Sequence, residues 1–278
     1  MRFPINFTKM NGAGNDFIII DHRRPLLDQK DMPSFVRGVC RRKFSVGADG
    51  LIFIEESGET DFSWQFFNGD GSKAEMCGNG ARCAARFAFE NGIAGREMSF
   101  MTQAGIIRAE VPGDSVKIAM TPPQDIRLER EVKIDNKTLT LHSLNTGVPH
   151  AVILVEDNRE TPVKEWGNLI RFHEMFSPAG ANVNFVEVTD SNSLYLRTYE
   201  RGVEDETLAC GTGAVASAVA VSLLGKAKDP VQVVTSGGET LKIYFSLHNQ
   251  PELGVNDVYL EGPARIIYQG ELMPESLN

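Results

Sequence analysis

The sequence has few cysteines and histidines, and it lacks both a long hydrophobic run and an excess of basic residues. Four cysteines among 278 residues are too few and too scattered for a disulfide scaffold. No run approaches the roughly 18 apolar residues of a membrane span, and the start MRFPINFTKM has no apolar signal core. The net charge of -9 argues against a nucleic-acid footprint. We therefore expect a cytoplasmic protein with reduced thiols and neither a membrane nor a nucleic-acid partner.

The chain repeats itself at one constant offset along the numbering, the offset that relates Cys77 to Cys210. Glycines, alanines and strand-like apolar runs coincide in this register over most of the chain. The aligned stretches are FFNGDGSKAEMCGNGA (66–81) with YERGVEDETLACGTGA (199–214), and VGADGLIFIEE (46–56) with AGANVNFVEVT (179–189). DFIIID (16–21) matches HAVILV (150–155) one residue out of register. We expect two similarly folded halves.

Each half predicts a strand, a cysteine turn, a helix and further strands. The helix after Cys210 is apolar nearly all round, which is typical of a buried helix. The helix after Cys77 carries Arg82, Arg86 and Glu90 at i, i+4 and i+8, which predicts one polar stripe. The fold class is α+β, with two pseudo-symmetric domains that each wrap a mostly antiparallel sheet or barrel around a central helix. The seam is expected near residues 121–131, where two prolines interrupt regular structure.

Both cysteines are expected at helix N-termini, where partial positive charge and unpaired N–H groups stabilise a thiolate and bind carboxylates. Two related halves usually enclose a ligand cleft. One thiolate could take a proton from a carbon while the opposite thiol returns one to the other face. The hypothesis is cofactor-free, two-base racemisation or epimerisation at the α-carbon of an amino acid.

Other interpretations of the cysteines fit less well. A redox dithiol prefers Cys-x-x-Cys, whereas Cys77 and Cys83 are six apart. Zinc requires more Cys or His at close spacing, and a cysteine hydrolase using His150 would leave one of the two matched cysteines idle. Cys40 and Cys83 are expected to be buried structural thiols. The non-enzyme alternative is a two-domain binding protein for small amino acids.

Several motifs resemble the diaminopimelate epimerase family over nearly the whole chain. They are KMNGAGNDF, FNGDGSKAEMCGNGARC, NTGVPH, NVNFVEV and YERGVEDETLACGTGA. The resemblance implies interconversion of LL- and meso-2,6-diaminopimelate for lysine and peptidoglycan precursor synthesis, with no cofactor and no metal. It implies a homodimer, and a C-terminal tail that returns to the first domain. The expected domains are therefore residues 1–122 plus 264–278, and residues 123–263.

The resemblance also assigns roles to single residues. Cys77 and Cys210 would be the acid/base pair, with His150 and Glu200 assisting catalysis by tuning or orienting the thiols. Tyr268 would lie at the homodimer interface. The substrate-binding residues would be Asn15, Asn68, Gly78, Asn79, Asn184, Glu200, Arg201, Gly211 and Thr212. Without the resemblance, Asn15 and Asn68 would equally suit turns, and Glu200 with Arg201 a solvated charged pair.

Two positions depart from the family pattern. Many relatives carry Asn where this chain has Val148, and some carry Gln where it has Gly50. Both positions contact substrate in members with the polar residue. Their loss puts details of substrate binding in doubt, but not the reaction.

Overall fold

The computed structural model describes residues 2–248 and 254–277, and it divides into two compact units. Unit 1 comprises Met1–Ile118 and Gly262–Asn278, and unit 2 comprises Ala119–Glu261. The C-terminal segment thus belongs to the unit built from the start of the chain. The boundaries expected from the sequence lie a few residues further along, after residues 122 and 263, and as domain limits they stay a prediction.

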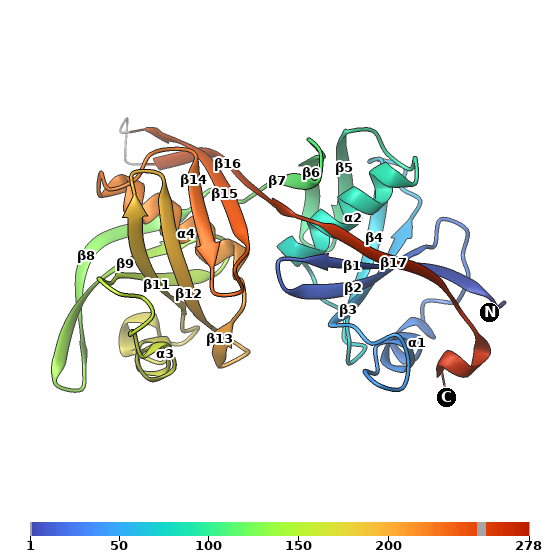
Figure 1. Cartoon of the computed structure of the whole chain (residues 1–278), viewed down its shortest axis with the longest axis horizontal. Coiled ribbons are helices and arrows are strands. Elements are labelled where there is room, and N and C mark those ends of the chain that lie inside the picture. The colour runs from blue at the N-terminus through green and yellow to red at the C-terminus, as the bar shows by residue number, and fades with distance from the viewer. Residues whose placement is uncertain (1, 249–253, 278) are drawn as a thin grey trace. The chain divides into compact units, whose positions relative to one another are not determined.

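Unit 1 is a sheet with two helices and a terminal 3-10 turn (Figure 1). Its elements are β1 (Ile5–Gly12), β2 (Asn15–Asp21), α1 (Met32–Val39), β3 (Gly50–Glu55), β4 (Phe62–Asn68), α2 (Gly78–Glu90), β5 (Glu97–Thr102), β6 (Gly105–Glu110), β7 (Ser115–Ala119), β17 (Arg265–Leu272) and η2 (Pro274–Leu277). The last strand, β17, pairs antiparallel with β1, which explains why the end of the chain joins this unit.

Unit 2 repeats this arrangement with its own two helices. Its elements are β8 (Gln124–Ile134), β9 (Lys137–Asn145), β10 (Pro149–Leu154), α3 (Val163–Arg171), η1 (Glu174–Phe176), β11 (Asn182–Asp190), β12 (Ser193–Glu200), β13 (Asp205–Thr207), α4 (Gly211–Leu223), β14 (Val231–Thr235), β15 (Thr240–His248) and β16 (Gly254–Pro263). The helix α4 begins and ends at the positions that the repeat pairs with the first and last residues of α2.

Strand pairing follows one pattern in both units. In unit 1, β1–β2, β3–β4 and β5–β6 are antiparallel, whereas β2–β3 and β4–β5 are parallel. In unit 2, β9–β10, β11–β12 and β14–β15 are antiparallel, and β10–β11 and β12–β14 are parallel. Parallel neighbours need a long crossover, and the helices α1, α2, α3 and α4 lie in those four connections. The sheets are mostly antiparallel, as expected, with helical crossovers at defined points.

The one-residue slip between the halves is visible in the strand register. Phe17 pairs with Gly50 in unit 1, and Ala151 pairs with Val183 in unit 2. Gly50 and Val183 are related by the offset of the repeat, whereas Ala151 lies one position beyond the residue that this offset assigns to Phe17. The slip read from DFIIID and HAVILV is therefore confirmed.

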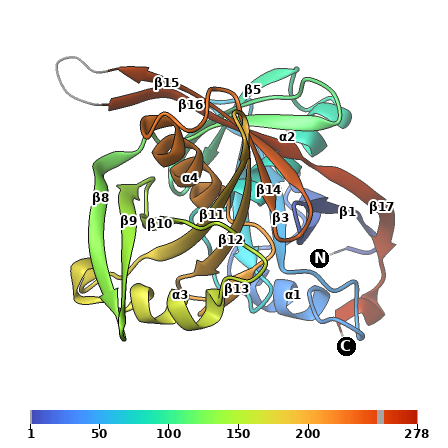
Figure 2. The ribbon, with the colours of Figure 1, turned by 60° about the vertical axis from the view of Figure 1, so that its left-hand side comes forward.

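Each sheet carries one helix on each face (Figure 2). In unit 2, Val183 and Phe185 pack with Ile170 of α3, whereas Asn184 between them points to Gly213 of α4. In unit 1, Leu51 and Phe53 pack in the core cluster of α1, and Ile52 lies against Gly80 of α2. Successive strand residues point to opposite faces, so α2 and α4 occupy equivalent places against the second face.

The two central helices differ in how closely they match the sequence prediction. In α4 every residue from Gly213 to Val221 is buried, as predicted for a helix that is apolar nearly all round. In α2 the predicted polar stripe is wrong at its first member. Arg82 is fully buried, whereas Arg86 forms the expected i, i+4 ion pair with Glu90 at 2.7 Å. Arg82 is held inside because backbone and side-chain oxygens accept from its guanidinium.

Candidate functional site

Cys77 lies at the N-cap of α2, with extended backbone (φ -146°, ψ 117°). Its carbonyl accepts the first helical hydrogen bond, from the Ala81 N–H at 2.8 Å. Cys77 is half-buried. The space beside the next residue is open, because the nearest atom to a β-carbon built at Gly78 would be 3.8 Å away. A helix N-terminus leaves its first N–H groups unpaired and favours negative charge. The sequence therefore places a thiol and an anion-binding backbone at one point of unit 1.

Two asparagines predicted to bind substrate meet beside this turn. The Asn79 side-chain N–H donates to Asn15 Oδ1 at 2.7 Å, and Asn15 Nδ2 donates to Asp49 Oδ2 at 3.1 Å. Asn15 comes from the β1–β2 hairpin and Asn79 from the first turn of α2. Asn68, at the end of β4, instead donates to Ser72 Oγ at 3.0 Å. Asn68 thus makes a hydrogen bond within its own turn, whereas Asn15 and Asn79 bond to each other beside the cysteine turn.

A cluster of charged side chains, of which only Lys9 is buried, supports the hairpin, and sequence reasoning missed it. Lys9 pairs with Asp16 at 2.7 Å and also donates to the Gly47 carbonyl, and Arg42 bridges Asp16 at 2.6 Å and Asp49 at 2.8 Å. Burial raises the pKa of Asp16, but the hydrogen bonds and charges of Arg42 and Lys9 outweigh it and lower that pKa to about 2. The sequence signal was weak, since Lys9 stands in a strand of mixed polar and apolar residues.

Cys210 lies at the equivalent N-cap of α4, again with extended backbone (φ -121°, ψ 106°). Its Sγ lies 3.5 Å from Thr212 Oγ1, and its carbonyl accepts from Ala214 N at 2.9 Å. Burial, and after it the charge of Glu200, together raise the pKa of the Cys210 thiol to about 12. The N–H groups of Thr212 and Gly213 act in the opposite direction. This thiol therefore holds its proton at neutral pH.

His150 is fully buried on β10, and its tautomer is set by Asn184. Asn184 Nδ2 donates to His150 Nδ1 at 3.1 Å and to the Ala151 carbonyl at 2.9 Å, while Thr198 donates to Asn184 Oδ1 at 3.0 Å. Because Nδ1 accepts, the ring proton belongs to Nε2. Within the described residues, Nε2 has no hydrogen-bond partner. Burial, with the nearby Arg201 charge, lowers the pKa of His150 to about 3, so the ring is neutral.

Glu200 is the last residue of β12, and Arg201 follows it directly. Arg201 N donates to Asn182 Oδ1 at 2.8 Å, and its guanidinium donates to the Ala179 carbonyl at 3.3 Å. Burial raises the pKa of Glu200. Since Glu200 raises the pKa of Cys210 and Arg201 lowers that of His150, these four predicted residues share one electrostatic neighbourhood.

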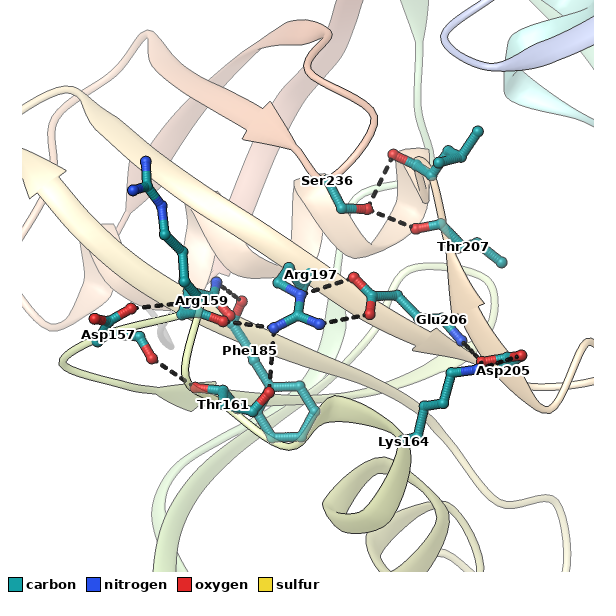
Figure 3. A network of polar contacts seen from close by, with 12 residues as sticks. Asp157, Arg159, Thr161, Lys164, Phe185, Arg197, Asp205, Glu206, Thr207 and Ser236 are labelled. Carbon is teal, nitrogen blue, oxygen red and sulfur yellow. Dashed lines mark hydrogen bonds and ion pairs between the residues drawn. The ribbon is translucent and has the colours of Figure 1, made fainter.

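The segment that leads into Cys210 is held from three directions (Figure 3). Arg197 forms a two-pronged ion pair with Glu206 at 2.8 and 2.7 Å, and Lys164 of α3 pairs with Asp205 at 2.9 Å. Ser236 Oγ donates to the Thr207 carbonyl at 2.9 Å. These contacts anchor β13 just before the cysteine turn.

The two departures from the family pattern differ in what the structure says of them. A β-carbon at Gly50 would lie 2.7 Å from the Phe66 ring and 2.8 Å from the Phe67 carbonyl. A larger residue is therefore excluded there by its neighbours on β4. Val148 accepts from Thr146 N at 3.1 Å through its backbone only.

Tyr268 lies on β17, remote in sequence from the cysteine turns, and is 45% exposed. Its ring contacts Phe7 edge-on at 5.8 Å. Its neighbours Ile266 and Ile267 are also exposed. These three adjacent large side chains are 39% to 54% exposed.

The described residues meet neither the requirements of a metal site nor those of a membrane-spanning helix. Residues 2–248 and 254–277 contain no group of three or more His, Cys, Asp or Glu side chains that could hold a metal ion. Among the helices of these residues, none is long and apolar enough to cross a membrane. Cys40 and Cys83 are buried, as expected, and burial raises the pKa of each to about 12.

Comparison with known proteins gives the same assignment along the whole chain. The diaminopimelate epimerase family model matches residues 7–126 and 142–267. A diaminopimelate epimerase of Aquifex aeolicus is 46% identical, covering 99% of this chain and 100% of that protein. One from Archaeoglobus fulgidus is 42% identical, covering 99% and 98%. The chain belongs to the diaminopimelate epimerase family.

Solved structures extend this family likeness to the fold. A phenazine biosynthesis protein of the PhzF family from Bacillus anthracis matches with a TM-score of 0.73 at 15% identity, covering 98% of this chain and 100% of that one. A hydroxyproline epimerase from Agrobacterium vitis matches with a TM-score of 0.67 at 13% identity, covering 99% and 94%. The α+β fold expected from the repeat is thus shared with these two solved structures.

Proposed function

We propose that this chain interconverts LL- and meso-2,6-diaminopimelate by transferring protons at one α-carbon with two cysteines and no cofactor. The observation that carries the proposal is the equivalent placement of Cys77 and Cys210, each at the N-cap of the central helix of its unit. Full-length identity of 46% to a diaminopimelate epimerase supports the substrate. The reaction belongs to the biosynthesis of lysine and of peptidoglycan precursors.

The scheme requires the two cysteines to act on opposite faces of the α-carbon, one as thiolate and one as thiol. Cys210 is the proton donor in the resting enzyme, since burial and Glu200 hold it as a thiol. Cys77 removes the substrate proton. The electron pair left on the α-carbon is stabilised by the helix N–H groups that hold the α-carboxylate, and the Cys210 proton then completes the inverted centre.

The remaining site residues bind and orient the substrate. Gly78, Asn79, Gly211 and Thr212 supply donors around the reacting carboxylate, as their places in the first turns of α2 and α4 support. Arg201 binds the distal carboxylate and Glu200 an ammonium group. Asn15, Asn68 and Asn184 complete the polar contacts. His150 assists through its Nε2–H, as a neutral donor.

A proton NMR assay in D2O tests the reaction directly, with LL-diaminopimelate as substrate and proline as the comparison. Deuterium is expected mainly at the inverted centre of the product, and proline is expected to be inert. The Cys77→Ala and Cys210→Ala variants should each lose at least about three orders of magnitude in kcat, the scale of losing an essential acid or base. Wild-type epimerisation by Cys77→Ala would contradict the two-base scheme.

The same assay separates the enzyme from a binding protein. Tight binding of diaminopimelate by calorimetry, with no deuterium incorporation, would favour a two-domain amino-acid-binding protein. Turnover favours the epimerase.

Assembly and location form a separate part of the proposal. We place the protein in the cytoplasm as a homodimer with Tyr268 at the interface. Exposed Ile266, Ile267 and Tyr268 on one strand support this surface. Sedimentation of Tyr268→Ala should show a monomer where the wild type is a dimer.

A further inference from the structure

A chain of four hydrogen-bonded side chains runs through unit 1 from a cation to an anion. Arg82 Nη2 donates to Asn79 Oδ1 at 2.8 Å, and Asn79 Nδ2 donates to Asn15 Oδ1 at 2.7 Å. Asn15 Nδ2 then donates to Asp49 Oδ2 at 3.1 Å. Arg82 is fully buried, and Asp49 is held by Arg42 at 2.8 Å.

The chemistry of the two ends gives the chain a direction. A guanidinium only donates and a carboxylate only accepts, whereas an amide side chain can turn over and exchange its donor and acceptor. With Arg82 at one end, Asn79 must present its oxygen to it. With Asp49 at the other end, Asn15 must present its NH2. Reversing either amide would place two donors or two acceptors face to face.

The direction decides what the asparagines offer to a ligand. Each amide donates one N–H within this series of hydrogen bonds. No group among the described residues accepts the second N–H of Asn79 or of Asn15. The backbone at this point is tightly fitted, since a β-carbon at Gly12 would lie 2.8 Å from the Asn79 carbonyl oxygen. The hairpin that carries Asn15 therefore packs closely against α2.

We propose that Arg82 and Asp49 are positioning residues that lock Asn79 and Asn15 with N–H donors outward, so that the pair recognises a carboxylate of the substrate. This rests on the proposed function, which makes both asparagines substrate ligands. Neither Arg82 nor Asp49 contacts substrate in this proposal. They act through the two amides.

A charge swap tests the direction of the chain. In Asn79→Asp, the new carboxylate still accepts from Arg82, but its second oxygen faces Asn15 Oδ1. If Asn15 turns over, its oxygen faces Asp49 instead. Adding Asp49→Asn removes this conflict, because the amide at position 49 can donate to Asn15. The Asp16 N–H also donates to Asp49 Oδ2, at 3.2 Å, and loses that acceptor when the new amide turns its NH2 toward Asn15. The measured coupling is net of this loss. The swapped double variant thus restores a continuous chain that runs the other way.

The first measurement is thermal unfolding of the substrate-free full chain for the two single variants and the double variant. Among the residues that the structure describes, the hydrogen bonds that join positions 79 and 49 run through Asn15, so the coupling should be transmitted by it. The double variant should melt at least about 2 °C above the value that the two single shifts predict. The coupling should vanish when all variants also carry Asn15→Ala. Asp61→Asn, which replaces the carboxylate that accepts from Ser99 N elsewhere in unit 1 by an amide, should be additive with Asn79→Asp.

Additive shifts for positions 79 and 49, or a coupling that persists with Asn15→Ala, would overturn the proposal. The second measurement is the KM for LL-diaminopimelate. Asp49→Asn should raise KM about tenfold with kcat within about threefold, because the loss is in binding. An unchanged KM would also overturn it. If the wild type shows no turnover, the proposed function fails. The unfolding measurements still test the hydrogen bonds that join Arg82, Asn79, Asn15 and Asp49.

Discussion

Gly213 stands directly over the side chain of Asn184, so that a β-carbon at this glycine would lie 2.3 Å from Asn184 Oδ1. It would also lie 3.2 Å from Cys210 Sγ. The second glycine of the ACGTGA turn is therefore fixed by packing between α4 and the sheet. Through Asn184 the same contact reaches His150, whose tautomer depends on that amide.

We expect Gly213→Ala to disturb both the cysteine turn and the amide beneath it. Overpacking of this kind costs about 1–3 kcal/mol of unfolding free energy, and kcat should fall as Cys210 and His150 shift. Urea unfolding with the D2O assay measures both effects. Gly113→Ala is the matched control, since no atom lies within 4 Å of a β-carbon there. Equal stability of the two variants would contradict the packing argument.

The neutral state of His150 predicts a pH dependence of stability. Its pKa falls from 6.5 to about 3 on folding, so between these values the unfolded chain binds more protons than the folded one. The His150 contribution is complete above pH 6.5 and is lost as the pH falls from there toward 3. Urea midpoints measured through this window should decline on acidification. His150→Gln should flatten the decline, and an unchanged slope would show that His150 is protonated in the folded protein.

Asp16 should be more important for folding than its partial exposure suggests. Asp16→Asn leaves the Lys9 ammonium, 8% exposed, without its carboxylate. Removing one partner of a largely buried pair costs about 3–5 kcal/mol, partly relieved here because Asp16 itself is 19% exposed. Asp114→Asn removes the fully exposed partner of Arg86 and should leave the denaturation midpoint nearly unchanged, because solvent screens that pair. Chemical denaturation of the two variants compares them directly.

The two ion pairs of Figure 3 should differ in strength. Arg197 makes two bonds to Glu206 and is 19% exposed, whereas Lys164 and Asp205 are 71% and 47% exposed. Arg197→Lys loses the two-pronged geometry and its bonds to the Asn158 and Thr161 carbonyls. It should cost about 1–3 kcal/mol and lower kcat through Cys210. Lys164→Gln should shift the urea midpoint much less, because water screens an exposed pair. The reverse order in urea unfolding would refute this ranking.

Much of the fold could be predicted because the two halves of the sequence repeat each other and can be compared position by position. The offset between Cys77 and Cys210 predicted both central helices, and the one-residue slip between DFIIID and HAVILV recurs in the strand pairing. Parallel pairing was not foreseen, since strand patterns alone do not show which neighbours run alongside. The helical segments that serve as crossovers decide it.

The details of the site depended on contacts between distant residues. Arg82, with Arg86 and Glu90, had the spacing of a solvent-facing stripe, yet it is buried because Asn79 and the Pro263 carbonyl accept from it. Pro263 lies far along the chain from α2, and no local pattern points to it. Likewise, the neutral state of the His150 ring follows from its complete burial. A single histidine in a strand does not predict that burial.

Arg82 has a further consequence when it is set beside its counterpart. The position of α4 that the repeat pairs with Arg82 is Val215. In an assembly of two identical chains, any substitution beside one thiol would appear beside the other as well. Here a duplicated sequence in one polypeptide lets each copy change alone, so one cysteine turn has a guanidinium beneath it and the other a hydrocarbon. The two cysteine turns thereby share one backbone arrangement but have chemically different surroundings.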